Sequence, residues 1–242
     1  MIEIVYNKTH SLSIVGDKIH QGHDYFIKCN ISNENPDIFI LMDSRGLSKS
    51  YEKSLAKMFV DYFHKEKYLL IIRPLELTTW ATLYNILSVN NLSPKVIITN
   101  VGIVDCTPKK KSICESILSQ INYFYDEKIS FIYLEDYLLS NGRIEKLYTI
   151  DYPESLIEKM NKKFRQYSIY AIKTPMVNPG IIIERKRPKS FFEQLMNTNN
   201  LIDQIDCNSI DLGRFNIQYT YDAVHWTQTA NKYIFNEVIK KL

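Results

Sequence analysis

Ser44, in a short turn, is a candidate catalytic nucleophile. Ser44 stands in the run Met42-Asp43-Ser44-Arg45-Gly46, directly after the apolar residues 37–42. A serine in a tight turn between a strand and a helix exposes its hydroxyl beside backbone amides, which is the arrangement of a nucleophile elbow. Gly46 favours such a turn because it has no Cβ to clash. The same D-S-x-G pattern is common in ordinary turns and helix caps, so the turn alone leaves both interpretations open.

A carboxylate and an imidazole stand close together near the other end of the sequence. Asp222 precedes His225 by three residues. A nucleophilic serine needs a base, and the base needs an acceptor that holds its tautomer. On a turn, the Asp222 carboxylate can reach Nδ1 of His225 and leave Nε2 facing outward. The alternative is a packed or surface histidine, because D-x-x-H also occurs by chance. Thr227 or Thr229 is expected to cap the helix that follows.

Together the two patterns resemble those of the SGNH hydrolases, also called the GDSL family. The family's first block is similar to D-S-x-G at residues 43–46, and its last block is similar to D-x-x-H at residues 222–225. A third match is Gly102-Ile103-Val104-Asp105, where the family often has G-x-N-D. The resemblance extends from about residue 37 to the last residue. The longer run at residues 102–108 also resembles a subgroup associated with bacterial surface-polysaccharide gene clusters.

The resemblance implies a role for each member of a catalytic triad. Ser44 would be the nucleophile and its own N–H an oxyanion donor, His225 would be the general base, and Asp222 would orient His225. The further residues that we expect at the oxyanion hole or the substrate are Gly102, Asn100, Arg73, Arg45 and Trp226. Trp226 follows the proposed base, so it either walls a sugar-sized pocket or packs in the core.

The sequence departs from the family pattern at three places. Met42 stands where the family has the glycine of its first block. Val104 replaces the asparagine that normally donates to the oxyanion, and a valine side chain cannot donate; Asn100 either substitutes for it or faces elsewhere. Arg73 stands where the second-block glycine is expected, and it either supplies positive charge or pairs with Glu76. Loss of one oxyanion donor typically costs about 10²–10³ in rate, so these departures suit a weakened or specialised enzyme.

The elements that must position these residues follow two periodicities. Residues 1–36 alternate apolar and polar side chains between turn signals, which predicts short antiparallel strands. From residue 37 onward apolar runs alternate with amphipathic stretches, which predicts parallel β-α-β units. The predicted strands cover residues 37–42, 68–72, 95–104, 129–134, 168–173 and, as a weaker candidate, 202–210; the predicted helices cover residues 48–64, 78–89, 111–125, 154–165 and 227–242.

These patterns predict an α/β fold with a doubly wound, mainly parallel sheet flanked by helices, a three-layer sandwich of the SGNH or flavodoxin-like type. A small β-rich appendage, residues 1–36, would precede one α/β domain, residues 37–242. Residues 175–200 are predicted to form a long loop or flap, because they contain proline-bounded turns and a run of charges. The charge runs at residues 109–111 and 184–189 are typical of solvated loops, with a phosphorylated or acidic ligand as the alternative. Ligands of such sheets bind beyond the carboxyl ends of the strands, where both Ser44 and Gly102 are expected.

The composition excludes several classes of protein. The chain has 242 residues and only 7 glycines, with neither G-x-G-x-x-G nor G-x-x-x-x-G-K-[ST]. A formal net charge of +3 is too near balance to indicate a nucleic-acid partner. The 4 cysteines and the histidines His10, His20 and His23 lack the spacing of a metal site or a disulfide framework. With no signal peptide and no run near the ~20 apolar residues of a membrane span, we expect a soluble, cytoplasmic protein that needs no metal or organic cofactor.

Three functions are compatible with these motifs and with the resemblance to the SGNH family. The first is an SGNH-type serine esterase that removes an O-acyl group, most simply acetyl, from a small-molecule or glycan ester through an acyl-enzyme. The second is an O-acyltransferase that acts on a sugar hydroxyl of a polysaccharide, with a donor such as acetyl-CoA held by the basic flap. The third is a binding protein on an SGNH-like fold with decayed catalysis, which Val104 favours and the retained Ser44, Asp222 and His225 disfavour. The sequence does not separate the first two, because they differ only in the nucleophile that attacks the acyl-enzyme.

Overall fold

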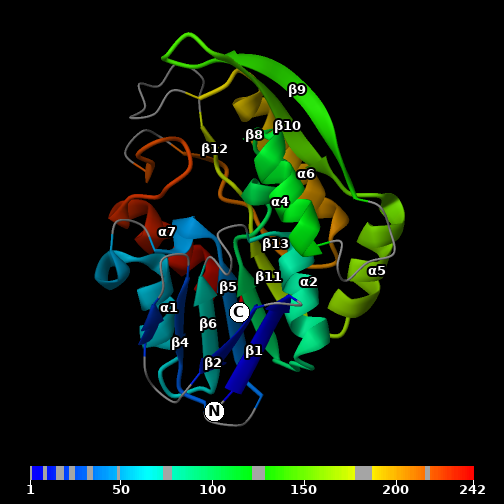
Figure 1. Ribbon diagram of the computed structural model, residues 1–242. Helices are drawn as coiled ribbons and strands as arrows, with labels where there is room; N and C mark the ends of the chain where they lie inside the picture. Colours follow the sequence, from blue (N-terminus) through cyan, green and yellow to red (C-terminus); the bar gives the residue numbers. More distant parts are fainter. Residues whose placement is uncertain are drawn as a thin grey trace.

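A seven-stranded sheet forms the centre of the molecule in the computed structural model (Figure 1). The structure describes residues 2–7, 10–14, 19–21, 25–31, 35–47, 50–72, 78–121, 129–177, 187–215 and 219–242. The sheet order is β13-β11-β7-β5-β6-β4-β3. Its parallel strands are β5 (Ile38–Met42), β6 (Tyr68–Ile72), β7 (Val96–Thr99), β11 (Ser168–Ile172) and β13 (Asn208–Ile210). At one edge β4 (Phe26–Cys29) and β3 (Ile19–Gln21) continue the sheet in antiparallel pairing.

The continuous apolar runs of β5 and β6 lie in the middle of the structure. The two strands pair in parallel from Ile38↔Tyr68 to Met42↔Ile72, and every residue of both is buried. Alternate side chains enter two separate cores, one on each face of the sheet. Both faces are covered, so the strands show no polar alternation.

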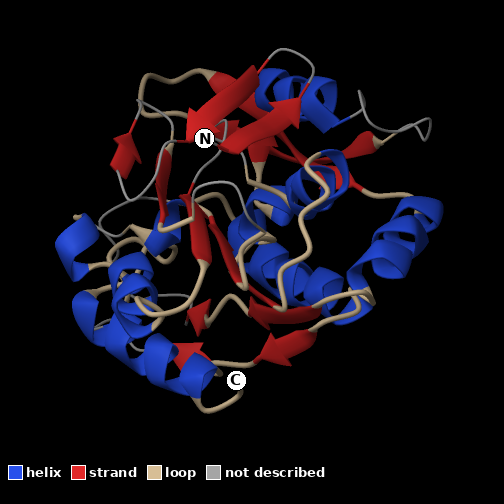
Figure 2. Ribbon diagram, turned by 90° about the horizontal axis from the view of Figure 1, so that it is seen from below, coloured by secondary structure: helices blue, strands red, loops and turns tan. Residues whose placement is uncertain are grey.

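Helices cover both faces of the sheet, so the fold has three layers (Figure 2). On one face lie α1 (Leu55–Tyr62) and α7 (Gln228–Ile239), and on the other lie α2 (Trp80–Val89), α5 (Glu154–Phe164) and α6 (Ser190–Gln204). The other helix of similar length is α4 (Lys111–Ile121), and shorter helical segments are η1 (Ser44–Gly46), η2 (Tyr51–Lys53) and α3 (Ile103–Cys106). The predicted fold class, an α/β sandwich with a mainly parallel sheet, is confirmed.

Three smaller sheets surround the central one. The long strands β9 (Ser130–Leu138) and β10 (Ile144–Asp151) form a hairpin that extends across one end of the molecule, with β8 (Lys109–Lys110) paired to β10 (Figure 1). β1 (Ile2–Asn7) pairs with β2 (His10–Ile14). β12 (Met176–Val177) pairs in parallel with β14 (Arg214–Phe215).

The structure corrects several predicted elements. α6 begins at Ser190, inside the segment predicted as a loop, and it extends to Gln204, into the start of the predicted strand at 202–210, of which only β13 is a strand. The predicted strand at 95–104 ends at Thr99, and the chain then enters α3. β10 was not predicted. Residues 178–186 of the expected flap lie outside the described residues.

The N-terminal strands are divided between two sheets. Among the described strands, β1 and β2 pair with each other in a separate sheet, whereas β3 and β4 belong to the central sheet. The division at residue 36 stays a prediction. In the described part of the chain, no helix combines the length and the apolar character needed to cross a membrane.

Candidate active site

The turn that carries Ser44 lies where the connections between successive strands run toward opposite edges of the sheet. β5 connects through α1 to β6 on one side, whereas β7 connects onward to β11 on the other side. β5 and β7 are themselves neighbours, so their carboxyl ends lie together, with Ser44 after one and Gly102 after the other. In parallel α/β sheets such a switch point is the usual place for a ligand.

A continuous chain of polar contacts connects Ser44, His225 and Asp222. Ser44 Oγ lies 3.1 Å from His225 Nε2, although 181 positions separate the two residues in the sequence. His225 Nδ1 lies 3.2 Å from Oδ1 and 3.1 Å from Oδ2 of Asp222. With the carboxylate accepting from Nδ1–H, Nε2 carries the lone pair that can accept the serine proton. The structure therefore brings together the three residues that the two sequence patterns singled out.

The turn before α7 is held by its own hydrogen bonds. Oδ1 of Asp222 accepts from the backbone N–H of Val224 at 3.1 Å and of His225 at 2.8 Å. The hydroxyl of Thr220 donates to the carbonyl of His225 at 3.0 Å. Between the acid and the base, Ala223 adopts a positive φ of 65°. The backbone thus fixes the spacing of the two side chains, and Thr227 caps α7 just beyond them.

Asp222 remains ionised although it is largely buried. Burial raises the pKa of its carboxyl, but hydrogen bonds from the side chain and backbone of His225, together with the charges of His225 and Arg187, hold the pKa well below its usual range. Arg187 Nη2 lies 2.7 Å from Asp222 Oδ2. Sequence reasoning missed Arg187, because one arginine in the charge run at residues 184–189 looks like any other solvated charge.

A buried ion pair lies beneath the turn that carries Ser44. Arg45 and Asp43 are fully buried and form a two-pronged contact, with Nε 3.0 Å from Oδ1 and Nη2 2.7 Å from Oδ2. The backbone N–H of Arg45 also donates to Asp43 Oδ1 at 2.9 Å, which caps η1. Arg45 Nη1 donates to Thr174 at 2.9 Å, and Nη2 donates to the carbonyl of Asn100. The guanidinium lies 5.0 Å from the ring centroid of Trp226.

These contacts place several predicted oxyanion or substrate residues below the site. Asn100 accepts from the Asp43 backbone N–H at 2.8 Å, and its Nδ2 donates to Asp43 Oδ1 at 3.2 Å, so its amide already serves the turn. Arg45 is 0% exposed and Trp226 is 1% exposed, which puts both beneath the turn and away from any surface that a substrate reaches. Arg73 lies outside the described residues.

Two glycines at the site are required by geometry. A Cβ at Gly46 would lie 2.7 Å from the Cβ of Met42 and 2.8 Å from its sulfur, so the turn closes only without a side chain. Gly102 has a φ of 125°, and its Cβ would lie 3.3 Å from Nε1 of Trp80. Val104 follows on α3, half-buried against the core, and its side chain offers no donor.

Asp105 ties α3 to its neighbours. Its Oδ1 accepts from the backbone N–H of Trp80 at 3.1 Å and from the Tyr152 hydroxyl at 2.6 Å, whereas its Oδ2 is buried with no hydrogen-bond partner. Burial outweighs these hydrogen bonds and raises the pKa of Asp105 to about 7. The part of the chain that the structure describes contains no group of three His, Cys, Asp or Glu side chains suited to a metal ion.

Comparison with known proteins gives likenesses in structure and none in sequence. No protein-family model and no curated protein matches the chain. A solved structure provisionally described as a platelet activating factor from Streptococcus pneumonia is 13% identical, with a TM-score of 0.45 over 87% of this chain and 86% of that one. A provisionally described GDSL-like lipase from Parabacteroides merdae is 11% identical, with a TM-score of 0.44 over 86% of this chain and 96% of that one. At this level of likeness, only the geometry of the site indicates the chemistry.

Proposed function

We propose that the protein is a serine hydrolase of the SGNH type that cleaves an ester through an acyl-enzyme. The observation that carries this proposal is the Ser44–His225–Asp222 chain, with 3.1 Å between Ser44 Oγ and His225 Nε2. A binding protein whose catalysis had decayed would have no need to keep a nucleophile, a base and an orienting carboxylate in contact.

The geometry supports a two-step reaction. Ser44 Oγ attacks the ester carbonyl while His225 Nε2 takes its proton, and Asp222 stabilises the imidazolium that results. His225 then returns the proton to the leaving alcohol. Water, deprotonated by His225, attacks the acyl-enzyme and releases the acid and free Ser44.

The oxyanion would be stabilised mainly by backbone groups. Ser44 is the first residue of η1, and Gly102 lies directly before α3, beyond the end of the neighbouring strand β7; we assign the N–H groups of both as donors. Val104 contributes none, and we assign Asn100 to holding the turn, since its amide bonds Asp43. With fewer side-chain donors than the family pattern has, the rate would be lower by about 10²-fold or more.

For the substrate we propose an O-acyl carbohydrate, with acetyl as the simplest acyl group. This rests on the resemblance of residues 102–108 to a subgroup associated with surface polysaccharides. The four free cysteines support a protein of a reducing compartment.

Labelling with a fluorophosphonate tests the nucleophile. We expect the wild type to be labelled, and the Ser44→Ala and His225→Ala variants to lose labelling by several orders of magnitude, because the triad acts as a unit. Ser119→Ala is the matched control, since Ser119 is exposed on α4 and should leave labelling unchanged. An unlabelled wild type, or labelling that persists in Ser44→Ala, would contradict the proposal.

Release of acetate from an acetylated glycan tests the reaction. The hydrolase proposal predicts release in buffer alone, at a rate that an added sugar acceptor does not raise. Release that requires the acceptor, with the acetyl group recovered on it, would identify a transferase instead.

A further inference from the structure

Arg187 binds both the side chain and the main chain of Asp222. Its Nη2 donates to Oδ2 at 2.7 Å and to the main-chain carbonyl of the same residue at 2.8 Å, and its Nε donates to that carbonyl at 2.9 Å. We propose that Arg187 is a positioning residue. It fixes the Asp222 carboxylate beside His225, and its positive charge weakens the stabilisation that the carboxylate gives to the His225 imidazolium. This inference rests on the proposed function.

Arg187 is itself held in place. Its guanidinium lies 4.8 Å from the ring centroid of Phe191, and only 11% of its side chain is exposed. Phe191 is buried in a small cluster that also contains Ala223, one of the two residues between the acid and the base of the proposed triad. The cluster therefore packs the start of α6 against the catalytic turn.

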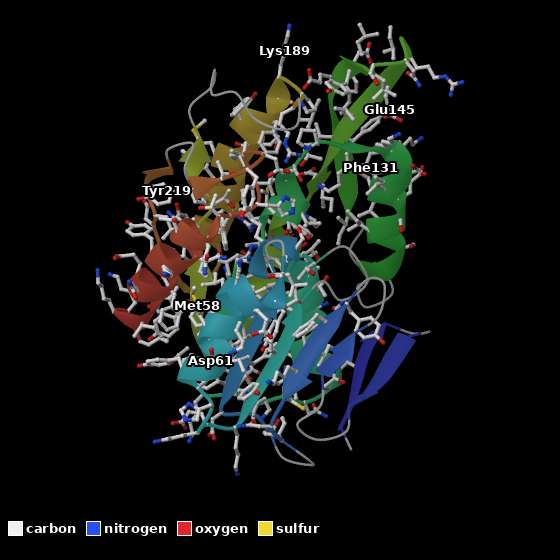
Figure 3. All side chains as sticks on the ribbon, turned by 90° about the vertical axis from the view of Figure 1, so that its left-hand side faces the viewer. Met58, Asp61, Phe131, Glu145, Lys189 and Tyr219 are labelled. Atoms are coloured by element: carbon white, nitrogen blue, oxygen red, sulfur yellow. The ribbon has the colours of Figure 1, made fainter. Side chains whose placement is uncertain are left out.

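The β9–β10 hairpin also fixes the start of α6. Oε1 of Glu135 on β9 accepts from the backbone N–H of Ser190 at 2.8 Å and from its hydroxyl at 2.6 Å. Figure 3 shows Lys189, just before α6, at the same end of the molecule as Glu145 and Phe131 of the hairpin. Arg187 thus contacts Asp222 from a segment that is held in place by the contact between Glu135 and Ser190.

The hydrogen bonds of Asp222 leave it little freedom. Oδ1 accepts from two backbone N–H groups of its own turn, Oδ2 accepts from Arg187, and Nδ1 of His225 lies near both oxygens. Because a guanidinium is a rigid fork, Arg187 can bind Oδ2 and the carbonyl at once, whereas a lysine offers a single point charge. Without the fork, the carboxylate would stay beside Nδ1 but would lose the fixed angle that aligns the imidazole with Ser44.

The charge of Arg187 also acts on the base. Among the described residues, the other charged groups in contact with this turn or with the elements packed against it are Asp43 and Arg45, which pair below Trp226, and Glu135, which is bonded to Ser190. Removal of the Arg187 cation would leave the carboxylate unopposed and favour the imidazolium. The activity would then fall on the acid side at a higher pH than in the wild type.

The test compares Arg187→Met and Arg187→Lys with Arg165→Met. Arg165 is a matched control, because it also pairs with an aspartate, Asp206, but is 71% exposed. We expect Arg187→Met to slow fluorophosphonate labelling by about 10²-fold, as for a misplaced catalytic group. Arg187→Lys should fall in between, and millimolar guanidinium should restore part of the lost rate in an Arg187→Ala variant.

The pH profile separates positioning from a general effect on folding. The midpoint of the acid limb should move to higher pH in Arg187→Met and stay in place in Arg165→Met. Wild-type labelling rates with an unmoved midpoint in both Arg187→Met and Arg187→Lys would overturn the proposal. The Lys variant keeps the charge and most of the volume, so it keeps the test valid if the Met variant fails to fold.

An NMR measurement distinguishes this proposal from the proposed function. The Nδ1–H proton of His225 should give a downfield signal in the wild type that shifts or disappears in Arg187→Met but not in Arg165→Met. This outcome with an unlabelled wild type would refute the hydrolase and retain the positioning role. A signal that is identical in all three proteins would refute the positioning role.

Discussion

Ser44 lies between two sets of polar groups with different tasks. On its hydroxyl side, His225 and Asp222 form the chain that can activate it. On its backbone side, Asp43 and Arg45 form a buried ion pair that shapes the turn. Removing one partner of such a pair leaves a buried charge uncompensated, which costs far more than the pair itself contributes.

The ion pair should be required for stability. We expect Arg45→Met to lower the free energy of unfolding by about 3–5 kcal/mol, because Asp43 would keep a buried charge without its partner. The double variant Asp43→Leu/Arg45→Met should cost less than the sum of the two single variants. Urea unfolding monitored by circular dichroism measures all three, and additive losses would contradict the interpretation.

The carboxylate of Asp222 should matter for activity more than for folding. In Asp222→Asn the amide cannot stabilise the imidazolium and favours the wrong tautomer of His225, so we expect labelling about 10³–10⁴-fold slower. Asp206→Asn provides the control, because Asp206 pairs with Arg165 at an exposed position. Equal labelling of the two variants would show that Asp222 does not orient the base.

At this scale the sequence predicted some residues and missed others for a physical reason. Ser44, Asp222 and His225 stand in short local patterns, so each chemical role shows within a few positions. Arg187 and the Asn100 amide act through partners 35 and 57 positions away, respectively, and nothing in their own surroundings shows it. Arg45 stands next to the nucleophile, yet only the fold shows that it faces inward.

At the scale of elements, the β5–η1 turn depends on a close approach of two backbone segments. Gly46→Ala would place its Cβ 2.7 Å from that of Met42. We expect a loss of about 1–3 kcal/mol in the free energy of unfolding, and slower labelling, because the turn that carries Ser44 must shift. Thermal unfolding and fluorophosphonate labelling measure the two effects.

Gly142→Ala is the control for strain alone. Gly142 has a φ of 77° in the β9–β10 turn, and a Cβ there would meet nothing within 4 Å. The left-handed conformation should cost about 1–2 kcal/mol, whereas labelling should stay at the wild-type rate. Slower labelling in this variant would mean that stability, and not the shape of the Ser44 turn, limits the reaction.

An element could be predicted where the residues that stabilise it form a pattern within the element itself. β5 and β6 are continuous apolar runs covered on both faces, and such runs are visible in the sequence. The start of α6 was not visible, because Lys189 makes no side-chain cap and the acceptor comes from Glu135, 55 positions earlier. β10 was missed because many of its residues are only partly buried, which gives a weak periodicity.

At the scale of the whole molecule, Asp105 links parts that are distant in the sequence. It bonds the first residue of α2 and, through Tyr152, the segment after β10. Burial raises its pKa to about 7, so between the unfolded value, near 4, and pH 7 the folded state binds more protons than the unfolded state. The contribution of Asp105 to stability therefore decreases as pH rises through this window.

A comparison of Asp105→Asn with the wild type tests this dependence. The asparagine does not titrate in the folded or the unfolded state. The free energy of unfolding of the variant should therefore rise by a few kcal/mol relative to that of the wild type between pH 5 and pH 7. Asp222, whose pKa is lowered, contributes the opposite dependence below about pH 4, outside this range. Urea unfolding at several pH values gives the difference, and Asp61→Asn, at an exposed position, should show none. A flat difference for Asp105→Asn would refute the buried acid.

The separation of 181 positions between Ser44 and His225, the proposed nucleophile and base, has a consequence for biosynthesis. If β5, β6 and β7 fold during synthesis, the Ser44 turn forms before the segment that carries His225 is translated. Until α7 packs on the sheet beside α1, the serine has no general base and should be as inert as any surface hydroxyl. Translation itself would therefore act as a safeguard, because only a chain synthesised past His225 could react with the esters around it.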